Sequence, residues 1–542
     1  MKPVLEDRLI TAGQALHYRP WFTRSGSTLD TKTVADDIYK GDFRLNNSVP
    51  NWKFQLPLDW ADDPFRDGNW QMSLHAFYML DPIIMQHKAD NNPKHLEFGL
   101  LLFKDWVHWH KDNNTIWSWY NMSVGIRSAK LSWLYSMLCQ RDEGLSKEDD
   151  DFLITLCQQH VDRVINGDVE LRMTNHGLFQ IHGLITLLHA VPGLRNTEQA
   201  YNFARDNLNC ILEAQFDHDR IHKEHSPGYH DFVIKLIRFF IESGLYERFE
   251  KLQEIYAQAL EHQFWLVDPS ARHWCIGDTG ATKEIISTQA TKLNAKPVGV
   301  IAMKNFDFGY VSIKSAKETP PENGSGMFIM GAFHSEIHKH LDDLTFEWFE
   351  FGKRLIIDSA SNGYKQGPER RYLLSTRAHN TVEIDGQSYS RRKEHAYGSA
   401  IESANEVNGV FIVEAKAPHT YLNAVHSRRF ELHPGKELII RDKITFSDEP
   451  RNSVQWFHIH PDAKLLSDDD DGTVFELDDV ELTFQTDANM GKIIKNGATT
   501  PDMQGWYSPG LRKIVPNYAL GFRMLEIPIT TRILVRKTNK AD

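Results

Sequence analysis

The apolar residues of this 542-residue chain change their period about halfway along, and no single fold class accounts for both patterns. From about residue 92 to residue 269, apolar side chains recur at three- and four-residue spacings, as on one face of an α-helix. An example is the run of Leu96, Leu100, Phe103 and Val107. Short polar stretches separate successive runs, which favours antiparallel helical hairpins.

After about residue 294 the period becomes two, as in a β-strand. Leu344, Phe346 and Trp348 alternate with polar residues, and then the phase slips. Many short strands with Asp-Gly and Pro-Gly turns follow, which is typical of an antiparallel β-sandwich. Because the chain is too long for one ordinary core, we expect two domains. These are a helical domain over residues 1–295 and a β-sandwich domain over residues 296–542.

Composition excludes several classes of partner. Sixty-one basic and 73 acidic side chains give a formal net charge of −12, which argues against bulk binding to nucleic acid or to an anionic membrane. A polyanionic substrate would therefore need a locally basic cleft. The N-terminus lacks an apolar segment of signal-peptide length, and no apolar run reaches the roughly 18 residues of a membrane span. We expect a cytoplasmic protein from the sequence as given, or a periplasmic or secreted one if a signal peptide has been removed.

Three histidines and three acids crowd into the eleven residues of FHSEIHKHLDD, which runs from Phe333 to Asp343. His338, His340 and Asp342 alternate there, so in an extended chain their side chains point to one side. His-X-His is also a common spacing for metal ligands. A solvated polar loop is the alternative, but this density of chemical groups favours a functional site.

Two polar clusters lie in the helical half. In IHKEHSPGYHDF, the Ser-Pro-Gly break places Tyr229 at a loop-to-helix junction beside Glu224 and His225. A tyrosine held there can donate or accept a proton; a tyrosine that only docks the loop by its ring is the alternative. In RMTNHGLFQIHG, Asn175 and His176 suit a helix start that faces a cavity, with a capping Asn beside a core His as the alternative.

Two strand ends in the β-half carry further ligand types. Asp358 ends an apolar strand, and His379 opens the next one. Strand pairing places Asp358 near Glu347 rather than His340, so the loop before the strand must fold back to bring the ligands together.

These stretches, taken together, resemble the heparinase II/III-like polysaccharide lyases. The match is carried by WSWYNMSVGIRSAKLSWL, TNHGLFQIHGL, EHSPGYHDF, HKHLDDLTFEWFEFGKRLIIDSASNGY and TRAHNTV, which occur in the family's order. The resemblance implies an incomplete (α/α) toroid followed by antiparallel β-sheet layers, that is, a multidomain α+β protein. It also implies cleavage of uronic-acid polysaccharides by β-elimination.

The resemblance assigns roles to individual residues. It implies that Asn175 and His176 meet the substrate uronate and that Tyr229 and His338 are the acid and base residues. The residues expected to bind substrate are Arg127, as a carboxylate or sulfate partner, together with His225, Trp119 and Arg371.

The resemblance also implies a metal. His340, Asp358 and His379 fall where some family members hold zinc, and two imidazoles with one carboxylate are ligands that zinc accepts. We expect one structural zinc per chain, because His340 lies only two residues from His338. One departure is Asp343, which follows Asp342 where several members have Gly or Asn, and which adds an acid near the pocket.

The expected reaction removes the proton at C5 of a uronate and expels the C4 oxygen. Donors must neutralise the charge that develops on the carboxylate, while a base reaches C5 and an acid reaches O4. Either Tyr229 performs both steps while His338 orients it, or the two share them, and His176 is a candidate base for the opposite C5 configuration.

The expected partner is an anionic glycosaminoglycan-type chain such as hyaluronan, chondroitin or heparan sulfate, with no nucleic acid and no membrane; a homodimer is left open. Two other functions compete with this one. A glycoside hydrolase would use Glu224 and Asp342 as its carboxylate pair. A carbohydrate-binding or polysaccharide-assembly protein would need no catalytic groups at all.

Overall fold

The computed structural model describes residues 31–45, 49–167, 173–282, 286–364, 366–488, 490–525 and 528–538. The chain forms two compact units that interleave along the sequence. The helical unit comprises the residues up to Gln215 together with Leu236–Glu254, and the β-rich unit comprises Phe216–Lys235 together with the residues from Ile255 onward. Segments on both sides of residue 295 belong to the β-rich unit. The domain boundary expected there stays a prediction.

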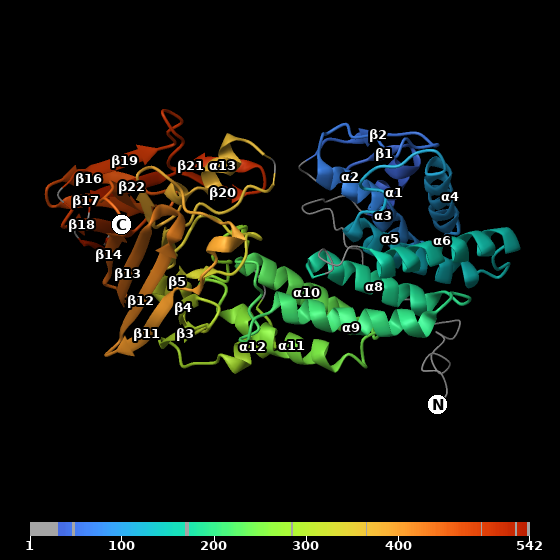
Figure 1. The fold of residues 1–542 in the computed structure, drawn as a ribbon, viewed down its shortest axis with the longest axis horizontal. Helices are drawn as coiled ribbons and strands as arrows, with labels where there is room; N and C mark the ends of the chain where they lie inside the picture. Colours follow the sequence, from blue (N-terminus) through green and yellow to red (C-terminus); the bar gives the residue numbers. More distant parts are fainter. Residues whose placement is uncertain are drawn as a thin grey trace. The chain divides into compact units, whose positions relative to one another are not determined.

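The helical unit is built from serial helices, as the apolar spacing predicts (Figure 1). Its helices are α1 (Thr31–Tyr39), α2 (Gly68–His75), α3 (Leu80–Asp90), α4 (Lys94–Trp109), α5 (Asn121–Cys139), α6 (Lys147–Asn166), α8 (Asn175–Ala190) and α9 (Thr197–Gln215). The hairpin of β1 (Asp42–Phe43) and β2 (Trp52–Lys53) precedes α2. Helices α10 (Pro227–Glu242) and α11 (Glu250–Glu261) each contribute residues to both units.

Helices α5 and α8 form the centre of the helical unit. Of the 19 residues of α5, 15 are buried, and of the 16 residues of α8, 12 are buried. Two glycines let their backbones touch: a Cβ on Gly125 would lie 2.3 Å from the Phe179 carbonyl oxygen, and a Cβ on Gly183 would lie 2.4 Å from the Gly125 oxygen. Small residues at a helix crossing thus allow closer packing than the usual 8–10 Å between axes.

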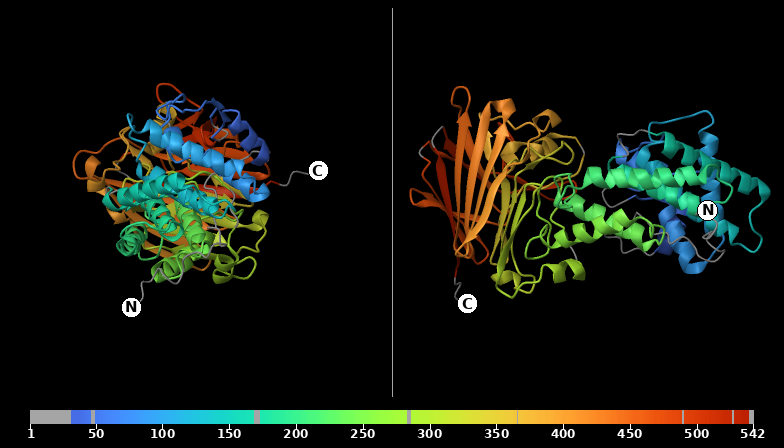
Figure 2. Two further views of the ribbon diagram at one scale, coloured as in Figure 1. Left: turned by 90° about the vertical axis from the view of Figure 1, so that its right-hand side faces the viewer. Right: turned by 60° about the horizontal axis from the view of Figure 1, so that its bottom comes forward.

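The β-rich unit has three main antiparallel sheets (Figure 2). The five-stranded sheet has the order β3 (Ile301–Asn305), β4 (Tyr310–Ser315), β5 (Ser325–Met330), β7 (Thr345–Glu350), β8 (Lys353–Ile356). The eight-stranded sheet has the order β11 (Ile401–Val407), β12 (Val410–His419), β13 (Ala424–His433), β14 (Glu437–Phe446), β23 (Ile529–Lys537), β18 (Val480–Thr486), β17 (Gly472–Leu477), β16 (Lys464–Asp469). The four-stranded sheet has the order β19 (Lys492–Asn496), β22 (Tyr518–Met524), β15 (Ser453–His458), β9 (Val382–Ile384).

Short elements complete the β-rich unit. They are α12 (Thr288–Leu293), α13 (Pro368–Leu374), the pair β6 (Ala332–Phe333) with β10 (Gly398–Ser399), and the pair β20 (Trp506–Gly510) with β21 (Lys513–Pro516).

The five-stranded sheet is buried on both faces, so it forms a middle layer. In β5, Met327 and Ile329 join the core between the sheets, whereas Phe328 and Met330 pack against a second cluster that includes Trp265. The phase slip in the sequence has a structural counterpart, because the pairing of β7 with β8 shifts register after Trp348. The predicted order of a helical domain followed by antiparallel sheets is confirmed.

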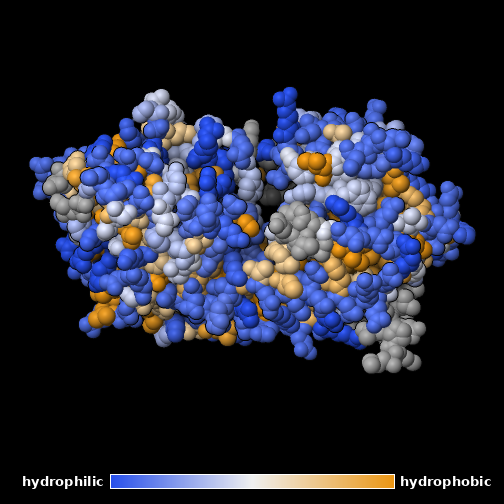
Figure 3. All heavy atoms as spheres, viewed as in Figure 1, coloured by the Kyte–Doolittle hydropathy of each residue, from blue (hydrophilic) through white to orange (hydrophobic). Residues whose placement is uncertain are grey.

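One face of the molecule is largely polar. On the face shown in Figure 3, hydrophilic residues dominate and hydrophobic residues form small, separate patches, as on an ordinary protein surface. No described helix is long and apolar enough to cross a membrane.

A buried ion pair ties the central strands of the eight-stranded sheet to two loops. Arg428 on β13 donates from Nε and Nη2 to the two oxygens of Asp442 on β14, at 2.7 Å each. Its Nη1 donates to the carbonyl oxygens of Leu344 and Asn380, at 2.9 and 2.5 Å. Both side chains of the pair are fully buried. Arg428 thereby fixes the backbone next to the predicted metal ligands.

Replacing this arginine tests how much the pair contributes. Arg428→Met leaves Asp442 charged and buried without its main partner, so the free energy of unfolding should fall by about 3–5 kcal/mol. Arg441→Gln on the neighbouring strand removes a half-exposed partner of Glu431 and should cost no more than about 1 kcal/mol. Chemical denaturation followed by circular dichroism measures both, and equal losses would contradict a special role for Arg428.

Candidate active site

His338 lies in the loop between β6 and β7, with its backbone at φ +54°. This left-handed conformation is uncommon for a residue other than glycine and marks a constrained position. Its ring Nδ1 lies 3.0 Å from Asp278 Oδ2, and Nε2 lies 3.4 Å from Glu224 Oε2. Both ring nitrogens therefore have a carboxylate neighbour, which fixes the plane of the imidazole.

Tyr229 covers the ring of His338 from the first turn of α10. The helix begins at Pro227, and the Ser226 carbonyl accepts hydrogen bonds from the amides of Tyr229 and His230. Proline is common at such a first helical position. The Tyr229 and His338 rings are stacked, with centroids 3.6 Å apart and planes 20° apart. The Tyr229 hydroxyl is hydrogen-bonded to the hydroxyl of Tyr364, which also lies 3.1 Å from His338 Nδ1.

The two tyrosines differ in exposure and keep their protons. Tyr229 is partly buried, and burial raises its pKa to about 12, against the opposing effect of the hydrogen bond with Tyr364. Burial likewise raises the pKa of Tyr364, although 46% of that residue's surface remains exposed. Tyr229 is thus a neutral phenol at neutral pH, in the form that can donate a proton.

Asp278 joins the groups around His338. Its carboxylate lies 3.0 Å from His340 Nε2, accepts from both terminal nitrogens of Arg370, at 2.6 and 3.0 Å, and accepts from Ser361 Oγ at 2.9 Å. Burial acts to raise the pKa of Asp278, but the hydrogen bonds from His338, His340 and Arg370 outweigh it and hold the pKa well below its usual range. The carboxylate therefore stays charged.

The backbone before Asp278 packs tightly against the loops of the cluster. Gly277 has φ +56°, and a Cβ there would lie 2.4 Å from the His225 carbonyl oxygen and 2.8 Å from that of His338. Only glycine suits both the conformation and the space.

His225, predicted to bind substrate, lies in the interior instead. Its side chain is fully buried, its Nδ1 lies 3.2 Å from the Ile337 carbonyl oxygen, and its Nε2 accepts from the His334 amide at 2.9 Å. These two contacts hold the loop that carries His338. Glu224 is also buried, and desolvation raises its pKa despite the nearby His338.

The predicted zinc ligands lie near one another, but their three ligand atoms are not all within 4.8 Å of one another. His379 Nδ1 lies 2.9 Å from Asp358 Oδ2, and the rings of His340 and His379 have centroids 5.3 Å apart. The buried His340 Nδ1 and His379 Nε2 have no hydrogen-bond partner among the described residues. Asp358 also donates its amide to Glu347 Oε1 at 3.0 Å, the neighbour that strand pairing predicts.

Within the described parts of the chain, a different set does have its three ligand atoms within 4.8 Å of one another. Its members are His218, Asp219 and Asp307. Two of its members are largely exposed, with 91% of the His218 side chain and 79% of the Asp307 side chain accessible. His340, Asp358 and His379 are buried, are residue types that bind zinc, and include two ring nitrogens without a hydrogen-bond partner among the described residues. The residue types therefore suit zinc, whereas the three ligand atoms do not all lie as close together as those of the exposed set.

Asn175 and His176 start α8 in the helical unit, and the predicted helix start is confirmed. Thr174 caps the helix by accepting from the His176 amide at 3.3 Å. The His176 ring packs edge-on against Tyr120, and its Nδ1 lies 3.5 Å from the Tyr120 hydroxyl. Both Asn175 and His176 are partly exposed, so they are accessible at a helix N-terminus, where anions bind favourably.

Arg127, expected at the substrate carboxylate, has no exposed surface in this structure. Its guanidinium donates to the His75 and Ser118 carbonyl oxygens at 2.6 and 3.0 Å, and to His160 Nε2 at 2.8 Å. It also lies over the Trp106 ring. These contacts hold helices of the toroid together rather than offering a free charge.

The remaining predicted residues lie on surfaces. Trp119 is partly exposed, whereas Arg371 on α13 is exposed. Its neighbour Arg370 is the one that turns toward Asp278. The sequence motifs assigned no role to Asp278 or Tyr364, and Arg370 belongs to the ERR run (residues 369–371) that offered candidate cations for a basic cleft. Asp278 lies between glycines in CIGDTG, a pattern that indicates a tight backbone but does not identify a partner.

Comparison with known proteins identifies the family. Residues 16–267 match the heparinase II/III N-terminus, and residues 309–515 match the heparinase II/III-like C-terminal domain. A search of curated proteins finds no match.

Solved structures share the fold at low identity. Heparan sulfate lyase HepC from Pedobacter heparinus is 16% identical over 97% of this chain and 87% of its own, with a TM-score of 0.69. A heparinase III structure is 15% identical over 97% and 88%, with a TM-score of 0.78. A chondroitinase AC lyase is 11% identical over 95% and 81%, with a TM-score of 0.55. The match to heparinase III confirms the predicted toroid followed by a β-sandwich. The chain belongs to the heparinase II/III-like family of polysaccharide lyases.

Proposed function

We propose that this protein cleaves a uronic-acid-containing polysaccharide of the glycosaminoglycan type by β-elimination and leaves a 4,5-unsaturated uronate end. The observation that carries the proposal is the hydrogen bond between the Tyr229 and Tyr364 hydroxyls above the ring of His338. β-Elimination needs a proton to be removed from C5 and a proton to be given to O4, two atoms that are both bonded to C4, and it needs no external nucleophile. A linked pair of phenols beside an imidazole supplies the groups for such transfer.

In this reaction the C5 proton leaves to a base, its electron pair forms the C4–C5 double bond, and the C4–O bond breaks. The departing O4 takes a proton from Tyr229, which its raised pKa keeps protonated at neutral pH. The family resemblance assigns the uronate carboxylate to Asn175 and His176 at the N-terminus of α8, where donors and a helix dipole stabilise developing negative charge. The base is His338, or Tyr229 itself when its proton passes through the Tyr364 hydroxyl to His338 and the phenolate then carries the C5 proton to O4, or His176 for the opposite C5 configuration.

The hydrolase alternative lacks its second carboxylate. Asp342 is fully buried and ion-paired with Lys339, so it cannot flank a glycosidic bond beside Glu224. Lys339 also lies 2.9 Å from Asp343 Oδ1, which accepts a hydrogen bond from the Tyr397 hydroxyl at 2.8 Å. The additional acid of this chain is therefore paired internally and adds little charge to the pocket. The filled cluster around His338 argues against a purely binding protein.

The tyrosine hydroxyl is the sharpest test of the mechanism. Tyr229→Phe keeps the ring that stacks on His338 and loses at most one hydrogen bond of about 1 kcal/mol, so folding should change little. The kcat should fall by roughly 10²–10⁴-fold, with KM near wild type. The assay follows the absorbance of the unsaturated uronate on hyaluronan, chondroitin sulfates, heparan sulfate and alginate.

Tyr421→Phe is the matched control, because Tyr421 is 60% exposed on the same unit. It should retain full activity. If Tyr229→Phe is nearly as fast as wild type, the hydroxyl is not the acid and the role passes to His338 and His176.

Asp278 is proposed as a positioning residue that holds His338 and Arg370. Asp278→Asn keeps the size but loses the charge that accepts from the Arg370 fork, so kcat should fall about 10–100-fold, as for other supporting groups of this kind, with KM little changed. Asp268→Asn is the control, since Asp268 is a buried partner of Arg354. The control should lower stability but not kcat. A parallel loss of kcat in both variants would show that only folding is affected.

We further propose one structural zinc held by His340, Asp358 and His379. When bound, the metal would fix the strand ends next to His338. Elemental analysis should find about one zinc per chain, and His340→Ala should lose both the metal and several degrees of Tm. His218→Ala removes a member of the exposed set and should keep the zinc. Zinc lost only from His218→Ala would place the metal at the exposed set instead.

A further inference from the structure

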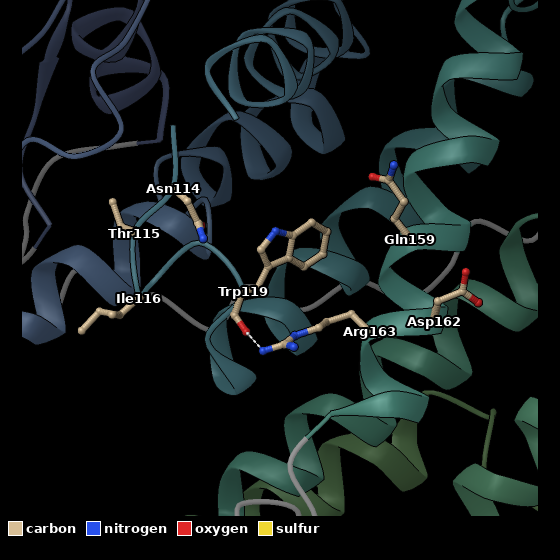
Figure 4. Close-up of a pocket in the computed structure, with 7 residues that line it drawn as sticks. All are labelled: Asn114, Thr115, Ile116, Trp119, Gln159, Asp162 and Arg163. Atoms are coloured by element: carbon tan, nitrogen blue, oxygen red, sulfur yellow. Dashed lines mark hydrogen bonds between the residues drawn. The ribbon is translucent and has the colours of Figure 1, made fainter. Parts of the chain in front are cut away.

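A surface hollow in the helical unit combines one aromatic ring with several planar polar side chains (Figure 4). Its volume is about 570 Å³, within the usual range of small-molecule sites. One wall is the loop from Asn114 to Trp119, and the other is the outward face of α6. The lining residues of α6 are Gln159, Asp162 and Arg163, which the helical spacing places on one face.

The ring of Trp119 is held rigidly from behind. Its centroid lies 5.4 Å from that of Trp106 and 5.1 Å from that of His160, and the buried guanidinium of Arg127 lies 5.3 Å from the indole. Trp119 is nevertheless only partly buried and borders the hollow. A fixed aromatic ring with an accessible surface costs little entropy to use for binding, and its apolar face complements the C–H face of a pyranose.

Arg163 is also fixed in place. One of its terminal nitrogens donates to the Trp119 carbonyl oxygen at 3.1 Å, as Figure 4 shows. That bond uses one of the five guanidinium N–H groups, so the side chain retains capacity to bind a ligand oxygen. Gln159, Asp162 and Asn114 add amide and carboxylate groups of the kind that bind pairs of sugar hydroxyls.

The charge of the hollow limits the kind of sugar. Among the described residues that line it, Arg163 is the one cation, and the adjacent Asp162 lies 4.0 Å from the exposed Arg195, which is not one of those lining residues. One carboxylate or sulfate can pair with Arg163, whereas a second anionic group on the same ring would meet Asp162 and be repelled.

We infer that the hollow between Trp119 and Arg163 is a sugar-binding subsite for one pyranose unit that carries at most one acidic group. The inference rests on the proposed action on a glycan chain and adds a preference for weakly sulfated segments. The subsite would bind substrate without taking part in the elimination.

The test uses the full-length Tyr229→Phe protein, so that binding is measured without turnover. Isothermal titration calorimetry with an unsulfated hexasaccharide of alternating glucuronate and N-acetylhexosamine gives Kd. Adding Trp119→Ala or Arg163→Gln should raise Kd about 5–50-fold, whereas Arg205→Gln, an exposed neighbour of Asp206 on α9, should leave it unchanged. Should Trp119→Ala fail to fold, Arg163→Gln and Gln159→Ala carry the test.

Unchanged Kd in the Arg163→Gln and Gln159→Ala variants would overturn the subsite. Tighter binding of a fully sulfated hexasaccharide, lost in Arg163→Gln, would overturn the limit of one acidic group. These outcomes are separate from the proposed reaction: a wild-type protein that yields no unsaturated product on any polymer refutes the lyase mechanism, whatever the Kd values of the variants.

Discussion

The buried carboxylate of Asp278 is the interaction on which the arrangement of the active-site cluster depends. An unpaired charge in the interior costs several kcal/mol, so Asp278 must be surrounded by donors wherever the chain places it. Here the donors are His338 and His340, from one loop, and Arg370, from a distant part of the sequence. Satisfying one charge therefore brings together the loop before β7 and the helix α13.

The same constraint explains why the backbone around the cluster is unusual. His338 and His225 both have positive φ values, a conformation that costs non-glycine residues of order 1–3 kcal/mol each. The hydrogen bonds of His225 to the loop and of His338 to Asp278 offset this cost. The result is an imidazole with a fixed orientation under the Tyr229 ring, so no reorganisation is needed when charge develops during the reaction.

Periodicity made the architecture predictable, because burial on one face leaves a regular signature in a helix or a strand. The alternation of apolar residues also breaks after Trp348, at the point where the strand pairing shifts register. The active site was only partly predictable. Tyr229 and His338 belong to dense polar motifs, but Asp278 and Tyr364 lie in irregular segments whose partners are distant in sequence, and no local pattern encodes such contacts.

Arginines were the hardest residues to assign from sequence, because the side chain is long and its burial depends on partners. Arg370 and Arg371 are adjacent, yet only Arg370 turns inward, where Asp278 accepts its fork. Arg127 lies in a motif from which binding of a substrate anion was expected. Its guanidinium instead donates to two carbonyl oxygens and lies over the Trp106 ring.

This use of cations bears on the substrate. Arg127, Lys339 and Arg428 are all buried and bound to internal oxygens, so their charges cannot pair with a bound polyanion. In a chain with a net charge of −12, cations committed to the interior are unavailable to offset the repulsion of a highly sulfated polymer. For the proposed glycan substrate, binding is then left to neutral donors, to helix N-termini such as that of α8, to aromatic surface and to accessible cations such as Arg163. The internal pairing that stabilises the fold is thus in keeping with the proposed preference for glycan segments of low charge density.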